Sequence, residues 1–298
     1  MKIFHLLNPS ARYEGWVRFL MDSARPSLAT NSQENSLTPT GSSQVLWQWV
    51  SKTHPDHTET IVEWAVKEGN QRIVVWGGDG TFHRAAKKLL AMAAEDKVEL
   101  ALVPVGTCND LARQIRLDRY FWRQWEHPTP PGTLTSYTVW DMNGDIVVNN
   151  AGFGRSRSDF EKRSGPLGTL RGFRSTAAEI TWPGGHLKGI YYMALACNAP
   201  YFSGGLHFDK TASPTDDLLD LYLVPATSKV RLGLRLLRGR IGLPLIDGKM
   251  TRLSVTGCTL KTDIPVWPQA DGEPPPAEGV NEIVFSRLPK KIRLWAPL

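Results

Sequence analysis

The sequence has little cysteine and no long apolar run, and both absences exclude classes of protein. Its three cysteines lie far apart, which excludes a disulfide framework or a zinc-ligand spacing and is typical of a reducing cytosol. No stretch reaches about 18 uncharged apolar residues, and the run from Ile3 to Leu7 is too short for a signal peptide or a membrane span. We therefore expect a cytoplasmic protein, whose contact with a membrane would be peripheral, at the inner surface.

The sequence also lacks basic segments interleaved with aromatic residues, which a groove for single-stranded nucleic acid would need. The formal net charge of +6 is mild and fits an anionic partner such as ATP or an acidic lipid. We expect no nucleic-acid partner. Nothing in the sequence indicates an oligomeric state.

One strand, one glycine-rich turn and one helix dominate the first half. The apolar run from Ile73 to Trp76 predicts a buried strand, and the run Gly77-Gly78-Asp79-Gly80-Thr81 predicts a tight turn before a helix that extends to Leu90. Such a turn offers backbone N–H groups and a positive helix end to phosphate. Asp79 among these amides indicates a metal ion or a hydroxyl group to deprotonate; a turn without a ligand is the alternative.

A second strand, loop and helix follow directly. Residues 99–104 predict a strand, the run Gly106-Thr107-Cys108-Asn109-Asp110 forms the loop, and a helix begins at Leu111. Strands that alternate with helices predict a parallel sheet, and the loops at the carboxyl ends of its strands face the same crevice. The two loops should therefore flank one nucleotide. Asn109 or Asp110 would alternatively serve as a helix N-cap.

The pattern changes after the proline-rich segment at 126–132, which predicts a domain boundary. Before it, we expect strands at 3–7 and 44–50, helices at 15–24 and 58–68, and a loop at 23–43. After it, Asn143-Gly144 predicts a hairpin turn between strands 137–142 and 145–149. The remaining strands are expected at 187–197, 218–224, 252–260, 282–285 and 291–295, and helices at 156–163, 169–180 and 230–240. The second half is thus mainly antiparallel.

The predicted helix at 230–240 is amphipathic and basic. Arg231, Arg235 and Arg238 share one helix face, and Leu234, Leu237 and Ile241 share another. One interpretation is a reversible contact with a membrane surface. The other, which is the commoner arrangement, has the leucines packed on the domain and the arginines in solvent. A second basic cluster comprises Arg155, Arg157, Lys162, Arg163, Arg171 and Arg174.

Five motifs in this order resemble the diacylglycerol kinase catalytic family, which includes sphingosine and ceramide kinases and bacterial soluble lipid kinases. They are Asn8-Pro9, the glycine run 77–81, the run 104–113, the run 216–221 and Asp271-Gly272-Glu273. The resemblance implies an α/β nucleotide-binding domain with a parallel sheet at 1–128, to which 282–298 return. It implies a mainly antiparallel β-sandwich that binds lipid at 129–281, with the active site in the cleft between the domains.

The resemblance also implies roles for particular residues. Glu273 matches the proton acceptor, with Asp79 as its rival, since Asp79 is also a candidate ligand for the magnesium that accompanies ATP. Asp216 and the backbone carbonyls of Leu219 and Leu221 match a supporting magnesium site, a ligand set that Mg²⁺ accepts. The residues expected around ATP are Thr53, Gly77, Gly78, Asp79, Gly80, Thr81, Phe82, His83, Gly106, Thr107 and Asn109.

We expect an ATP- and Mg²⁺-dependent kinase that transfers the γ-phosphate to a hydroxyl of a diacylglycerol-like or long-chain-base lipid. One alternative is a kinase of a soluble hydroxyl compound, because NAD kinases and phosphofructokinases are similar in the glycine run. Another is a lipid- or nucleotide-binding regulator without turnover. Relatives usually carry a short residue, Asn and Glu where this chain has Phe82, His83 and Arg84. His83 would either contact phosphate or, more simply, face solvent.

Overall fold

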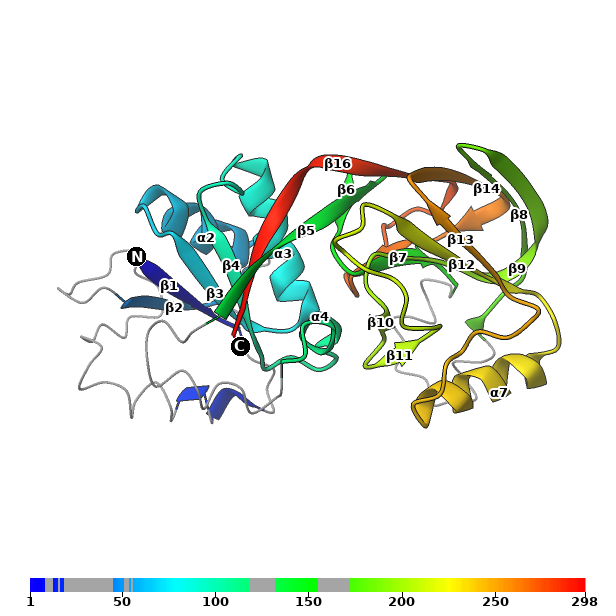
Figure 1. Ribbon diagram of the computed structural model, residues 1–298, viewed down its shortest axis with the longest axis horizontal. Helices are drawn as coiled ribbons and strands as arrows, with labels where there is room; N and C mark the ends of the chain where they lie inside the picture. The colour runs from blue at the N-terminus through cyan, green and yellow to red at the C-terminus, as the bar shows by residue number, and fades with distance from the viewer. Residues whose placement is uncertain are drawn as a thin grey trace. The chain divides into compact units, whose positions relative to one another are not determined.

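The computed structural model describes residues 1–8, 13–15, 17–18, 45–50, 54, 56–117, 132–154 and 172–297. The chain divides into two compact units, Met1–Tyr137 with Lys290–Leu298, and Thr138–Pro289 (Figure 1). The proline-rich segment that predicted the boundary lies outside the described residues. The ranges 1–128 and 129–281 therefore stay a prediction.

The first unit contains the predicted parallel sheet. Its strands lie in the order β2, β1, β3, β4 and β16, and all neighbouring pairs are parallel. Strands β1 and β3 are buried along their whole length, which explains why both are nearly continuous apolar runs. The bounds are β1 (Ile3–Leu7), β2 (Val45–Trp49), α2 (His57–Lys67), β3 (Arg72–Gly77), α3 (Asp79–Ala91), β4 (Glu99–Pro104), α4 (Asp110–Gln114) and β16 (Val280–Pro297).

The second unit is mainly antiparallel. Strands β13, β12, β9, β8, β14 and β16 follow one another in its sheet, and β7 pairs with β9 and β15. The predicted hairpin is present: β5 pairs with β6, and Asn143 and Gly144 have positive φ angles. The remaining bounds are β5 (Gly132–Met142), β6 (Asp145–Val147), β7 (Asn150–Phe153), β8 (Thr176–Trp182), β9 (Gly185–Cys197), β10 (Tyr201–Phe202), β11 (Leu206–His207), β12 (Leu219–Pro225), α7 (Lys229–Arg240), β13 (Thr251–Val255), β14 (Gly257–Val266) and β15 (Gln269–Ala270).

Three sequence-based predictions of elements were wrong. The helix expected at 169–180 is strand β8 from Thr176 onwards, because Thr176, Ala178 and Ile180 alternate as buried residues with period two. The single strand expected at 252–260 is two strands, since β13 pairs with β12 whereas β14 pairs with β8 and β16. Conversely, the two strands expected at 282–285 and 291–295 are one strand, β16. The helix expected at 156–163 lies outside the described residues.

Helix α7 forms as predicted, but its faces are the reverse of the commoner arrangement. Leu234, Leu237 and Ile241 are exposed, so the expectation that they pack on the domain was wrong. Arg235, expected in solvent, is buried and pairs with Asp247. The prediction failed because an arginine with a carboxylate partner can occupy the buried face of a helix. Of the second basic cluster, all but Arg174 lie outside the described residues.

No described helix combines the length and the apolar character that a membrane crossing requires. This agrees with the sequence, in which no apolar run is long enough.

A buried histidine lies in the core of the first unit. The indole Nε1–H of Trp76 donates a hydrogen bond to Nδ1 of His5, at 2.9 Å. Burial lowers the pKa of His5 from 6.5 to about 4, because a charged imidazolium would lose its hydration there. Trp76, for which the sequence suggested no role, thus helps to hold β3 against β1.

We predict that His5 makes the stability of the protein pH-dependent. The unfolded chain binds a proton more tightly than the folded one, so the stabilisation is complete above pH 6.5 and is lost as the pH falls towards 4. Between pH 7 and pH 5 the free energy of unfolding should fall by about 2 kcal/mol on account of this group. Urea unfolding of the wild type and of His5→Gln at both pH values measures the difference.

The exposed His186 provides the matched control. His186→Gln should keep the pH dependence of the wild type, while His5→Gln should flatten it. An equal pH dependence in the wild type and His5→Gln would show that His5 is not the group responsible.

Candidate functional site

The two glycine loops of the first unit lie against each other. A Cβ placed on Gly106 would come within 2.2 Å of the Gly78 Cα, and a Cβ on Gly78 would come within 3.1 Å of the Gly106 Cα. Only glycine at position 106 permits this approach, because the atom it would meet belongs to the backbone. The structure therefore brings together the two loops that the sequence assigned to one crevice.

Asp79 connects the loops by hydrogen bonds. Its Oδ2 accepts the backbone N–H of Asp110 at 3.1 Å, and its Oδ1 accepts that of Leu111 at 2.9 Å. These are orphan amides at the start of α4, so Asp79 satisfies them from a different segment of the chain. The sequence indicated a metal ligand or a base at this position; the structure shows a carboxylate that also joins α3 to α4.

Asn109 closes the second loop on itself. Its side chain accepts the N–H of Gly106 at 3.0 Å and donates to the Gly106 carbonyl at 2.9 Å. Asn109 precedes α4 with a φ of 54°, in the left-handed region, and its side chain makes no capping bond. The expected N-cap at Asn109 is thus present by position only, since the side-chain bonds to α4 come from Asp79.

The residue that follows β1, Asn8, contacts the first glycine loop and the end of β3. The Asn8 side chain donates to the Thr81 hydroxyl at 3.0 Å, and the Asn8 backbone N–H donates to the Trp76 carbonyl at 2.7 Å. A Cβ on Gly77 would come within 2.8 Å of the Thr81 Cβ. Three segments that are distant in sequence therefore form one compact group. They are the end of β1 at Asn8, the first glycine loop (Gly77–Thr81) and the second loop (Gly106–Asp110).

The other residues that were predicted to bind the nucleotide differ in how exposed they are. Thr107 is exposed, Gly80 is half-buried, and Thr53 lies outside the described residues. Phe82 and His83 are buried in the first turn of α3. The expectation of a solvent-facing His83 was wrong, since only 2% of it is exposed. Position 83 therefore belongs to the packing of the unit, which the sequence alone did not indicate.

In the second unit, Glu273 follows a buried carboxylate that holds three backbone amides. Asp271 accepts the N–H groups of Val148, Asn149 and Asn150 at 2.8, 2.7 and 3.0 Å. Asp271 and Gly272 have φ angles of 51° and 80°, and the Glu273 N–H donates to the Ala270 carbonyl at 2.8 Å, which makes a tight turn. The half-buried Glu273 thus stands on a turn fixed from β7.

The predicted magnesium ligands lie at the start of β12. The Asp216 Oδ1 accepts the N–H of Leu218 at 3.0 Å, while the adjacent Asp217 is paired with Arg287 at 2.9 Å. Leu219 and Leu221 lie within β12, which has β9 on one side and β13 on the other. Their carbonyls are therefore next to paired strands, so a metal would have to use remaining lone pairs and water. In the described part of the chain, no cluster of three or more His, Cys, Asp or Glu is arranged for a metal.

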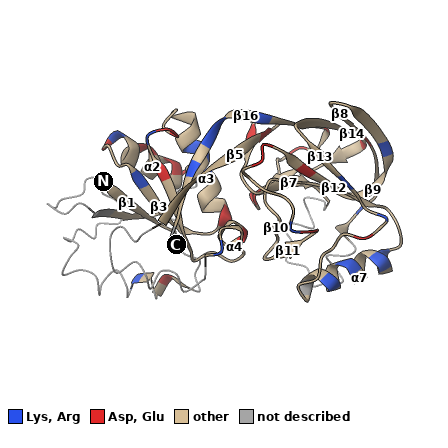
Figure 2. Ribbon diagram, viewed as in Figure 1, with Lys and Arg blue, Asp and Glu red and all other residues tan. Residues whose placement is uncertain are grey.

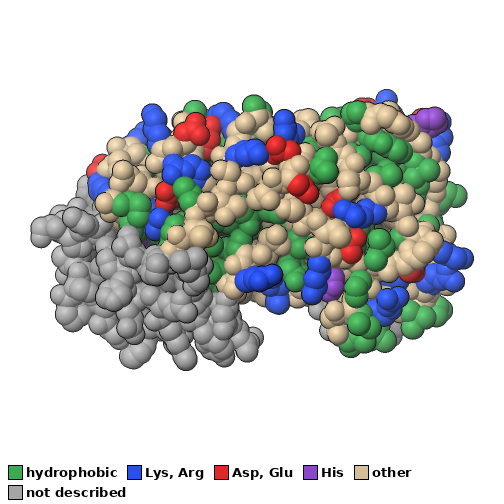
Figure 3. All heavy atoms as spheres, in the orientation of Figure 1, with side chains coloured by type: hydrophobic (Ala, Val, Ile, Leu, Met, Phe, Trp, Pro, Cys, Tyr) green, Lys and Arg blue, Asp and Glu red, His purple; other side chains and the backbone are tan. Residues whose placement is uncertain are grey.

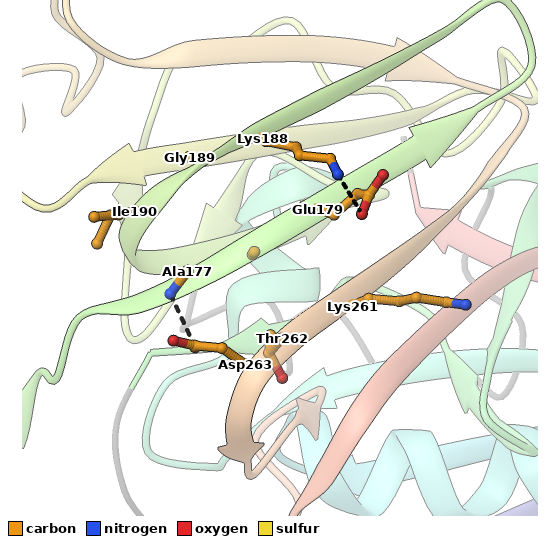
Figure 4. Close-up of a pocket in the computed structure, with 9 residues that line it drawn as sticks. Ala177, Glu179, Lys188, Gly189, Ile190, Lys261, Thr262 and Asp263 are labelled. Atoms are coloured by element: carbon orange, nitrogen blue, oxygen red, sulfur yellow. Dashed lines mark hydrogen bonds and ion pairs between the residues drawn. The ribbon is translucent and has the colours of Figure 1, made fainter.

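A shallow pocket on the second unit has no feature of a reaction centre. It lies on strands β8, β9 and β14 (Figure 4). Its charged groups have partners: Lys188 is 3.1 Å from Glu179, and the Asp263 carboxylate accepts the Ala177 N–H at 3.0 Å. The pocket contains none of the predicted site residues.

Comparison with known proteins finds the same two-part organisation. Residues 29–129 match the diacylglycerol kinase catalytic domain, and residues 140–296 match the YegS C-terminal NAD kinase beta sandwich-like domain. A "Probable lipid kinase YegS-like" protein of Pseudomonas syringae pv. tomato is 30% identical over 256 residues, which cover 80% of each chain. One from Shewanella frigidimarina is 26% identical over 273 residues, 83% of each chain.

Two solved structures share the fold. A diacylglycerol kinase from Bacillus anthracis has a TM-score of 0.70 and 18% identity, with 98% of this chain and 96% of that chain covered. An NAD kinase from Archaeoglobus fulgidus, solved in complex with ATP, has a TM-score of 0.52 and 11% identity, with 99% and 94% covered. The α/β unit with a parallel sheet and the β-rich second unit are thus an established architecture.

We predict that Asp79→Asn destabilises the first unit. An asparagine side chain has one acceptor oxygen, and its NH₂ group would face one of the two α4 amides. The free energy of unfolding should fall by about 1–3 kcal/mol, the cost of unsatisfied buried donors. Denaturant unfolding measures this, with the exposed Asp96→Asn as a control that should leave stability unchanged. Wild-type stability in Asp79→Asn would contradict the joining role and favour direct participation of Asp79 in chemistry.

Proposed function

Because the chain belongs to the YegS-like lipid kinases of the diacylglycerol kinase catalytic family, we propose that it transfers the γ-phosphate of ATP to a hydroxyl group of a lipid. The observation that carries this proposal is the approach of Gly78 to Gly106, which places two side-chain-poor loops and the start of α3 at one point. The acceptor we favour is a diacylglycerol-like or long-chain-base lipid.

In this proposal the first turn of α3 binds the phosphates. The first N–H groups of a helix have no acceptor within the helix, and the helix dipole favours negative charge there. Gly77, Gly78 and Gly80 lack side chains, so a phosphate can approach the backbone. Gly106, Thr107 and Asn109 supply the opposite wall, and Thr53 and Thr81 complete the proposed set. Phe82 and His83, which were expected beside ATP, are buried and would act by packing behind the turn. Asp79 keeps the two walls together through its bonds to α4.

Glu273 is the proposed proton acceptor. A carboxylate that takes the proton of the attacking hydroxyl makes that oxygen a better nucleophile. The turn supports this role, because the buried Asp271 fixes the backbone next to Glu273 through three hydrogen bonds. Asp79 is the weaker candidate, since both of its oxygens already accept backbone N–H groups.

Bound ATP and Mg²⁺ would supply the phosphoryl group and neutralise its charge. Asp216 is the charged member of the proposed supporting magnesium site, with the Leu219 and Leu221 carbonyls beside it. Because magnesium keeps several waters, three protein ligands are chemically sufficient. With Leu219 and Leu221 in a doubly paired strand, Asp216 and water would provide most of the ligands.

The test is a transfer assay with labelled ATP and Mg²⁺ over mixed micelles. The acceptors are diacylglycerol, monoacylglycerol, sphingosine, ceramide and a prenol, with NAD and a sugar phosphate as soluble controls. We expect label in one lipid. Glu273→Gln should lower its rate by about 10²–10⁴-fold, because general-base catalysis is lost while binding of ATP is kept.

Glu278→Gln is the matched control, since Glu278 is an exposed glutamate five residues further along the same segment. It should keep the wild-type rate. Label in NAD or the sugar phosphate would instead favour a kinase of a soluble compound. Binding of ATP without transfer to any acceptor would favour a non-catalytic regulator, and full activity of Glu273→Gln would exclude Glu273 as the base.

A further inference from the structure

Helix α7 exposes a continuous apolar stripe that the fold does not use. At about 100° per residue, positions 230, 234, 237 and 241 fall on one side of the helix. Their side chains are more than half exposed: Val230 (74%), Leu234 (58%), Leu237 (60%) and Ile241 (68%). Leu243, just beyond the helix, is also exposed. Single exposed apolar residues are ordinary, but a contiguous group on one helix face indicates a contact surface.

The opposite side of α7 fixes the helix to the second unit. Leu232 is buried, and Arg235 makes a two-pronged ion pair with Asp247, at 2.8 and 2.9 Å. Arg235 lowers the pKa of the Asp247 carboxyl, so the pair stays charged at neutral pH. A Cβ on Gly239 would come within 2.8 Å of Leu206, which shows how closely α7 lies on its neighbours. The exposed stripe is therefore held outwards by a rigid inner face.

The charge around the stripe has one sign. Residues 229–246 include Lys229, Arg231, Arg235, Arg238 and Arg240 and no Asp or Glu. Arg231 and Arg238 lie about a quarter turn from the apolar stripe, where their side chains border it. The Lys229 ammonium group donates a hydrogen bond to the Phe173 carbonyl and lies over the Tyr192 ring. It adds its positive charge to the same region. Figure 2 shows α7 with basic and no acidic segments, and Figure 3 shows basic and hydrophobic side chains next to one another over it.

We propose that the outer face of α7 docks the protein on an anionic lipid bilayer, with Val230, Leu234, Leu237 and Ile241 among the acyl chains and Arg231 and Arg238 at the headgroups. An apolar stripe bordered by cations is the pattern of helices that lie in the plane of a membrane interface. The inference deepens the proposed function, because a kinase that phosphorylates a lipid has to reach it in a bilayer. Four apolar side chains, the exposed Arg238 and the half-buried Arg231 give reversible attachment, so the protein can also leave.

Charge complementarity favours a bilayer over a second copy of the chain. A symmetric dimer through α7 would bring the same face of both copies together, and thus cations against cations. An anionic bilayer offers negative headgroups above a hydrocarbon layer, which matches both parts of the face.

The experiment is sedimentation of the full chain with vesicles of phosphatidylglycerol and phosphatidylcholine in equal parts, and with phosphatidylcholine alone. The wild type should bind the anionic vesicles, and added salt should weaken the binding. Leu234→Glu should lower the affinity at least tenfold, because an apolar contact is replaced by a charge that anionic lipid repels. Arg238→Gln should lower it about fivefold, the effect of one basic residue near the surface.

Matched variants serve as controls. Ile190→Glu changes an apolar residue on β9 whose exposure (60%) is similar to that of Leu234 (58%), and Lys97→Gln removes an exposed cation from the first unit. Both variants should bind like the wild type. Unfolding curves of all four variants check that they are folded. Sedimentation needs neither ATP nor turnover, so failure of the kinase proposal is observed separately, in the transfer assay. No binding of the wild type, equal binding of Leu234→Glu, or a dimer that Leu234→Glu dissociates would each overturn the proposal.

Discussion

The first unit depends on one carboxylate placed between two glycine loops. Gly78 and Gly106 approach so closely that no side chain fits between them, and the Asp79 oxygens receive the two amides at the start of α4. Charge-assisted bonds to orphan helix amides are stronger than ordinary ones. The position of α4 relative to α3 follows from this arrangement. The glycines make the approach possible, and Asp79 holds it.

In the second unit, too, an aspartate side chain accepts hydrogen bonds from backbone amides. The buried Asp271 holds three consecutive amides that lead from β6 into β7, and the turn that contains it carries Glu273. In both units, an acidic residue inside a motif that suggests chemistry satisfies backbone donors. A buried carboxylate without such partners would be costly, so the hydrogen bonds explain how the buried Asp271 is tolerated; Asp79 is half-buried. In the proposed function, the chemistry belongs to neighbouring groups: the helix amides in one unit and Glu273 in the other.

The sequence was informative where one physical signal dominates. Apolar runs followed by glycine turns predicted β3, β4 and the parallel sheet, and Asn143-Gly144 predicted the hairpin of β5 and β6. It was uninformative where a residue depends on a distant partner. The sequence around Arg235 does not indicate its ion pair with Asp247, and the sequence around Trp76 does not indicate its hydrogen bond to the buried His5. Strand β8 was missed because Ala177, Ala178 and Glu179 favour helices, and they outweighed the strand preference of Thr176 and Ile180. The joining roles of Asp79 and Asp271 likewise become visible only when separate segments meet.

Helix α7 illustrates why its pattern in the sequence is ambiguous. A surface helix normally has one apolar stripe, which packs on the core. Here two stripes lie on opposite sides: Leu232, Leu236 and Gly239 face the unit, while Leu234, Leu237 and Ile241 face away. An arginine in the inner stripe makes that side less apolar than the outer one, so hydropathy alone selects the wrong face. The burial of Arg235 is stable because Asp247 neutralises it, and this leaves the more apolar side outwards. A helix with this distribution is suited to packing on the protein with one side and, as we propose, to binding an anionic lipid bilayer with the other.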